Sequence, residues 1–83
     1  MVIAEYDVKE WLSREDVDTI KKGTIFEFTI NDNPEPYKAI VYRADKRLST
    51  YHFFAVITDG INAGYKLHVQ YNGVNQSAHI KIY

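Results

Sequence analysis

The 83-residue sequence contains no cysteine. Disulfide bridges, thiolate metal sites and a cysteine nucleophile are therefore excluded. Small secreted domains usually depend on disulfide bridges, so their absence favours a reducing compartment, and we expect a cytoplasmic protein. The N-terminus agrees with this expectation, because it lacks the positively charged segment with which a signal peptide begins.

Long apolar runs and linker-like segments are also missing. The longest apolar run, Phe53 to Ile57, is far too short to span a membrane. The two prolines fall in one short cluster, Asn33 to Pro36, which indicates a loop. Since the sequence has no internal repeat and its length is close to the lower limit for independent folding, residues 1–83 are predicted to form a single domain.

The net charge is small, but the charged residues are unevenly placed. The formal net charge is −1, yet residues 1–35 carry four basic and nine acidic side chains, whereas residues 36–83 carry six basic and two acidic ones. The front of the chain is therefore acidic (−5) and the back is basic (+4). Such an asymmetry indicates an interaction surface, or else it simply keeps both halves in solution.

Residues 1–22 are predicted to be helical. Ser13, with Asp16 three residues later, suits the N-cap of a second helix, and Gly23 suits a helix C-terminus. We therefore expect two short helices or one kinked helix, with Glu15 and Asp16 near the positive end of the dipole. Apolar side chains recur at the spacing of a helix face, with a break in phase near Ser13, at Val8, Trp11, Leu12, Val17 and Ile20.

After Gly23 the periodicity changes to two, which indicates strands. Five strands are expected, over residues 24–30, 37–44, 50–58, 65–71 and 78–83. The third is apolar on both faces, so we expect it to lie centrally. The short connections, including the Asn72-Gly73 turn, favour an antiparallel meander.

The predicted fold class is α+β. The N-terminal helical segment, residues 1–22, has to bury its apolar stripe on one face of the twisted antiparallel meander of about five strands formed by residues 23–83. The last strand, which ends at Tyr83, is expected to be an unpaired edge that a second copy of the chain would extend. Both a monomer and a homodimer remain open.

No arrangement of residues suited to catalysis stands out. The histidines are His52, His68 and His79, and the last two lie in the polar phase of the strands that flank the Asn72-Gly73 turn. We expect them to be solvent-facing cross-strand neighbours without a third metal ligand. The serines fall in caps or turns, and the glycines form no phosphate loop. The sequence therefore predicts a protein that is not an enzyme and holds no cofactor or metal.

The acidic front of the chain is the first candidate binding surface. Its carboxylates avoid the apolar stripe, so they would steer and hold a basic protein partner through complementary potential. A solvated helix face explains the same residues equally well. The residues concerned are Glu10, Glu15, Asp16 and Asp18.

The sheet face opposite the helices is the alternative surface. Basic and aromatic side chains on an open sheet form a platform for single-stranded nucleic acid, which would make the chain a small nucleic-acid-binding or phage-type regulatory module. The isoelectric point of about 6.3 speaks against this alternative. The residues expected on this face are Lys38, Tyr42, Lys66, His68, His79 and Lys81, with Tyr83 beside them.

Three features follow one another along the chain: a tryptophan-bearing acidic helix, the segment Gly23 to Phe28, and a meander that contains Asp59-Gly60 and the segment Gly64 to Val69. This order resembles small bacterial immunity proteins, which protect a cell from its own polymorphic or contact-dependent toxins. The resemblance implies a cytoplasmic inhibitor that binds a toxin domain and blocks or distorts its active site. It carries over no binding residue by position. If the toxin is a nuclease, the four acidic residues named above are expected to supply the contact.

Overall fold

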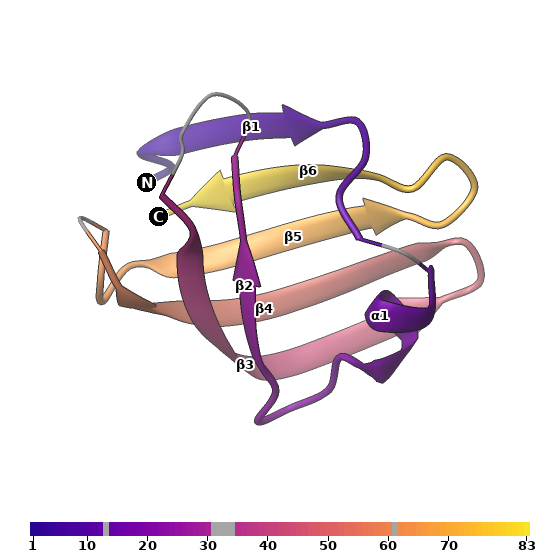
Figure 1. Ribbon diagram of the computed structural model, residues 1–83, viewed down its shortest axis with the longest axis horizontal. Coiled ribbons are helices and arrows are strands. Elements are labelled where there is room, and N and C mark those ends of the chain that lie inside the picture. The colour runs from indigo at the N-terminus through magenta and orange to yellow at the C-terminus, as the bar shows by residue number, and fades with distance from the viewer. Residues whose placement is uncertain (13, 31–34, 61) are drawn as a thin grey trace.

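The structure is a computed structural model that describes residues 1–12, 14–30, 35–60 and 62–83. All strands in these residues belong to one antiparallel sheet, in the order β1-β6-β5-β4-β3-β2 (Figure 1). The two edges of the sheet are thus β1 and β2, which are neighbours in the chain. The elements are β1 (Ala4–Val8), α1 (Arg14–Thr19), β2 (Ile25–Phe28), β3 (Tyr37–Arg47), β4 (Thr50–Asp59), β5 (Lys66–Asn72) and β6 (Ser77–Ile82).

The predicted α+β fold is wrong, because the chain is mostly β and the segment 1–22 does not pack on the sheet as helices. Its first part is β1, in which Val8 is buried and its neighbour Asp7 is exposed, as in a strand. β1 pairs with β6 along its whole length, from Ala4 opposite Ile82 to Val8 opposite Ala78. This pairing satisfies backbone groups of β6 that would otherwise be left at an edge, so it overrides the helical spacing of the apolar residues.

The helix α1 spans only six residues. Trp11 and Leu12 precede it in a non-helical segment that runs from one sheet edge toward the other. We call residues 9–12 the crossing segment. The amide of Trp11 donates to the carbonyl of Gln76 at 3.1 Å, and the hydroxyl of Tyr71 donates to the carbonyl of Leu12 at 3.3 Å. Tertiary hydrogen bonds therefore hold this backbone, and Ser13, the predicted N-cap, lies outside the described residues.

The meander predicted after Gly23 is present as β2 to β6, but its last strand is not an edge. β6 is hydrogen-bonded to β1 on one side and to β5 on the other. The expected pairing of β6 with a second copy is therefore wrong, since its ladder groups are already used within the chain.

Two irregularities in β3 bend the sheet. The register of β3 against β4 shifts between Lys38 and Ala39 and again between Val41 and Arg43. Such bulges increase the local twist and bend the strand that carries them. Figure 1 shows the consequence, because β2 crosses the view at a steep angle to β4, β5 and β6. The curl turns one face of the sheet inward.

The core lies on this concave face. Buried residues alternate along the central strands, and α1 and the residue after it add Val17 and Ile20 to the same cluster. The strand residues of the cluster are Val8, Phe28, Tyr37, Ala39, Val41, Phe53, Ala55, Ile57, Leu67, Val69, Tyr71, Ala78, Ile80 and Ile82.

In the described part of the chain, no helix has the length and apolar character needed to cross a membrane.

Ile80→Ala is expected to lower the free energy of unfolding by about 2–5 kcal/mol, because it removes a fully buried side chain and leaves a cavity. Ile80 lies in β6 between Tyr6 and Val69. Urea unfolding measures the change. The matched control is Val74→Ala at a residue that is 80% exposed in a turn, for which we expect a change within about 0.5 kcal/mol. Equal effects of the two variants would contradict the described core.

Amide hydrogen exchange is expected to show alternating protection along β1. An edge strand directs only every second amide toward its single neighbour, so protected and unprotected amides should alternate from Ala4 to Val8. Exchange followed by NMR resolves the individual amides. Continuous protection through these residues would instead indicate the helix that the sequence predicted.

Candidate functional site

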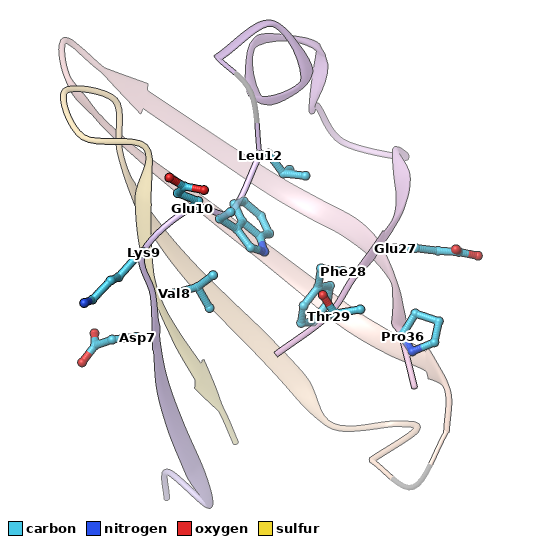
Figure 2. Close-up of a pocket in the computed structure, with 10 residues that line it drawn as sticks. Asp7, Val8, Lys9, Glu10, Leu12, Glu27, Phe28, Thr29 and Pro36 are labelled. Carbon is cyan, nitrogen blue, oxygen red and sulfur yellow. The ribbon is translucent and has the colours of Figure 1, made fainter. Parts of the chain in front are cut away.

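A cleft of about 960 Å³ lies between the two sheet edges, and we call it the seam cleft. One wall is the end of β1 with the chain that follows it, residues 7–12, and the other is formed by residues 27–29 at the end of β2, with Pro36. Figure 2 shows Val8 and Phe28 on opposite sides of this cleft. β1 and β2 are the two ends of the sheet order, so the cleft is the open seam of the curled sheet.

The floor of the seam cleft is aromatic. The ring centroid of Trp11 lies 5.7 Å from that of Phe26 and 6.2 Å from that of Phe28, both in edge-on geometry. It lies 6.1 Å from the ring of Tyr71 on β5, and Phe28 stacks on Tyr37 at 5.3 Å. These contacts join the crossing segment to β2, β3 and β5, and they fix the distance between the two walls.

The indole nitrogen of Trp11 is an unpaired donor. Nε1 is buried and has no hydrogen-bond partner among the described residues. A buried donor that lacks an acceptor costs about 1–3 kcal/mol, so such groups are uncommon in folded proteins. Trp11 lines the seam cleft, but Nε1 itself is covered by the surrounding side chains.

Acidic side chains dominate the rim of the seam cleft. Asp7, Glu10 and Glu27 line it against a single lysine. The carboxylate of Asp7 lies 2.6 Å from Nδ1 of His79, so its charge is partly offset when that ring is protonated. Glu27 faces Lys38 at 3.9 Å in an exposed ion pair, which screens little of its charge. The rim therefore carries a net negative charge that rests mainly on Glu10 and Glu27.

The other acidic residues predicted to bind a partner lie on α1, shortly after the crossing segment. Glu15, Asp16 and Asp18 are all exposed. Asp18 also has a structural part, since the hydroxyl of Tyr51 donates to its carboxylate at 2.8 Å and the ammonium of Lys46 donates to its carbonyl at 2.6 Å. These contacts hold α1 against β3 and β4, so Asp18 is less suited than its neighbours to meet a partner.

The residues of the alternative surface lie on the convex face of the sheet, but they do not form one basic cluster. His68 is opposite Lys81, and His79 is opposite Gln70, so the two histidines are diagonal to each other and not direct cross-strand neighbours. Glu5 is opposite Lys81 and interrupts the positive charge. The residues of the alternative surface that lie on this face are Lys38, Tyr42, Lys66, His68, His79 and Lys81.

Phe54 occupies the middle of the convex face, although its sequence position did not single it out. The ring of His68 stacks on it with a centroid distance of 4.6 Å and an angle of 2°, and the guanidinium carbon of Arg43 lies 5.3 Å from its centroid. Since β3 and β5 flank β4 on opposite sides, these two groups cover opposite faces of the phenyl ring. A nucleobase needs a free ring face, so the geometry does not favour a stacking platform here.

His52 and His68 form a hydrogen-bonded pair, with 3.1 Å between Nδ1 and Nε2. One ring has to donate and the other to accept, so at least one of them is neutral. Burial, and then the positive charges of His52, Lys81 and His79, hold the pKa of His68 below its ordinary value of 6.5. The described residues contain no group of three or more side chains that could hold a metal ion.

Part of the seam cleft could have been found from the sequence. Apolar and acidic residues alternate over residues 4–8, which is a strand pattern and places the first wall on a sheet edge. No local pattern shows that Glu10 and Glu27 line the same cleft, because only the curl of the whole sheet brings them to it.

Comparison of the chain with protein-family models, with curated proteins and with solved structures gives no match.

Acidification is expected to destabilise the fold through His68. Its pKa is lowered in the folded state, so between that lowered value and about 6.5 the unfolded chain binds more protons, and stability falls as the pH falls. Urea unfolding at about pH 7.5 and about pH 5 should show a larger loss for the wild type than for His68→Gln, which cannot titrate. Equal losses in the two proteins would contradict this assignment.

Proposed function

We propose that this chain is a non-enzymatic protein-binding domain that holds a basic partner protein in the seam cleft. The observation that carries the proposal is the composition of this cleft, which has an aromatic floor, an unpaired indole donor and a rim of three carboxylates against one lysine. Concave sites with apolar walls and a few polar groups are where proteins usually bind ligands. Tryptophan is also the residue type most enriched among those that dominate binding energy.

The charge of the rim supports a protein partner over nucleic acid. Carboxylates repel a phosphate backbone, whereas lysine and arginine side chains of a protein are attracted to them. The exposed carboxylates of Glu15 and Asp16 on α1 extend the negative surface beyond the rim. Long-range attraction of this kind raises the rate of association even where it adds little to the final affinity.

We further propose that the partner is a toxin domain and that binding inhibits it in the cytoplasm. Support comes from the pattern of the sequence, which resembles immunity proteins, and from the acidic front of the chain, which complements a basic toxin such as a nuclease. In this proposal Trp11 contacts the toxin from the floor of the cleft. The sequence predicted that Trp11 would lie on a helix, but it lies in a non-helical segment.

Neutralising the rim with Glu10→Gln and Glu27→Gln together is expected to weaken capture of the partner by about tenfold, since it removes two of the negative charges at the rim that attract a basic protein. The immobilised wild type and double variant are exposed to a lysate of the native host, and the bound proteins are quantified by mass spectrometry. We expect a basic protein that the wild type retains and the double variant loses.

The matched control neutralises the same number of carboxylates on α1, with Glu15→Gln and Asp16→Asn. This variant should retain the partner at nearly the wild-type level. If the α1 variant loses the partner while the rim variant keeps it, the interface lies on α1, and the proposed use of the seam cleft is wrong.

The inhibitory role has a separate test. If the native host carries a toxin gene beside the gene for this chain, the two are co-expressed and growth is measured. Wild type should restore growth and the rim variant should restore less of it. A toxin that remains fully active beside the folded wild-type chain would contradict inhibition but not protein binding.

A further inference from the structure

The two walls of the seam cleft belong to strands with one free edge each. Among the residues that the structure describes, β1 pairs only with β6 and β2 pairs only with β3. An edge strand leaves about half of its amide and carbonyl groups directed away from its single neighbour, and these groups form a template for another strand. The seam cleft therefore lies beside backbone that is ready to pair.

β2 is the better template of the two edges. Its inward-facing residues Phe26 and Phe28 contact the ring of Trp11, so a strand added beside β2 would place its own inward side chains next to the indole. Ile25 is 59% exposed at the start of β2, and Glu27 projects from the same strand at the rim. β2 thus carries two aromatic groups on its inward face, and an apolar and an acidic group on its outward face.

We propose that the seam cleft binds an extended segment of a partner protein, in which basic and apolar residues alternate, and that this segment adds to the free edge of β2 as a seventh strand. The inference rests on the proposed function and specifies what the partner presents. Apolar side chains of the segment pack on Trp11 and Phe28, while its lysine or arginine side chains meet Glu10 and Glu27.

A second copy of this chain is a poorer occupant than such a segment. Pairing two β2 edges in antiparallel fashion would bring Glu27 of each copy toward the other, and like charges across a strand pair are destabilising. The rim likewise repels nucleic acid. A basic segment is the occupant whose charge complements both the edge and the rim.

Trp11 makes a direct test feasible, because it is the only tryptophan in the chain and lies in the cleft. The probe is an acetylated and amidated peptide of about seven residues in which lysine alternates with valine and leucine, long enough to run past both ends of β2. It is titrated into the full chain while tryptophan emission is recorded, and NMR follows the backbone amides. We expect a saturable shift of Trp11 emission and amide changes concentrated in residues 25–29.

Two further peptides separate strand addition from simple attraction. In the first, alternate backbone nitrogens of the same peptide are methylated, which removes hydrogen-bond donors but keeps every charge; we expect binding about tenfold weaker or more. In the second, glutamate replaces lysine, and no binding is expected. Equal binding of the methylated and unmethylated peptides would overturn the added strand.

Protein variants complete the test, with thermal melting used to confirm that each one is folded. Glu10→Gln with Glu27→Gln should weaken binding of the lysine peptide about threefold to tenfold, whereas Glu15→Gln with Asp16→Asn, which neutralises charges outside the cleft, should weaken it by about twofold at most. An emission shift that instead follows protein concentration without peptide, or one that follows oligothymidylate, would assign the cleft to a second copy or to nucleic acid and would overturn the inference.

The outcome is distinguishable from failure of the proposed function. If capture of the partner depends on Glu10 and Glu27 but no lysine peptide shifts Trp11 emission, the cleft binds protein by another mode, and only the added strand is refuted. If capture of the partner is also unaffected by loss of the Glu10 and Glu27 carboxylates, both the proposed function and the added strand are refuted.

Discussion

The packing of Trp11 across the open seam is the interaction on which the rest of this structure depends. A curled sheet whose edge strands do not pair cannot enclose its own core, because closure of a barrel requires a continuous ladder. The crossing segment between β1 and β2 fills this gap, and the indole contacts rings on β2 and β5. The apolar side chains of the concave face are covered from water by this segment together with Val17 and Ile20, which α1 and the residue after it contribute.

Covering the core with the crossing segment leaves unsatisfied groups at the seam. Closing the core with a loop and a tryptophan, and not with a seventh strand, leaves two free edges, an open cleft and a buried indole N–H without an acceptor. Free edges are a hazard for a small β protein, because they invite pairing with other chains. The carboxylates along the seam repel acidic chains and attract basic ones. Free backbone groups and the charge that selects their partner therefore occur at one place. That combination distinguishes the seam from the convex face, where the aromatic and charged groups are already paired with one another.

The parts of the fold that could be predicted from the sequence are those with local signals. Strands β2 to β6 follow alternation and turn residues that act over a few positions, and they lie close to where the sequence placed them. The N-terminal segment failed because Val8, Trp11 and Leu12 have helical spacing by coincidence. In the structure Val8 reaches the core from a strand and the other two from a loop, and pairing with β6, more than 70 positions away, decides between the two readings. Local spacing contains no information about such a partner.

The candidate site was harder to predict for a related reason. Glu10 was recognised as an accessible carboxylate, but its neighbours in the cleft come from β1 and β2, and the bulges of β3 decide whether those edges meet. The histidines show the same dependence on register. His68 and His79 share the polar phase of adjacent strands, yet the register makes them diagonal and gives His68 a contact with His52 instead.

The acidic and basic parts of the sequence lie on different strands of the folded chain. The acidic front third supplies both edges and the crossing segment, whereas the basic residues of the remainder lie on β3, β5 and β6. The negative charge is therefore concentrated on the edge strands, the crossing segment and α1, and the positive charge lies on β3, β5 and β6, of which β3 and β6 directly neighbour the edges. Carboxylates, free backbone groups of the edge strands and exposed parts of two aromatic rings thus meet at the seam, and on this combination the proposed binding of a basic partner depends.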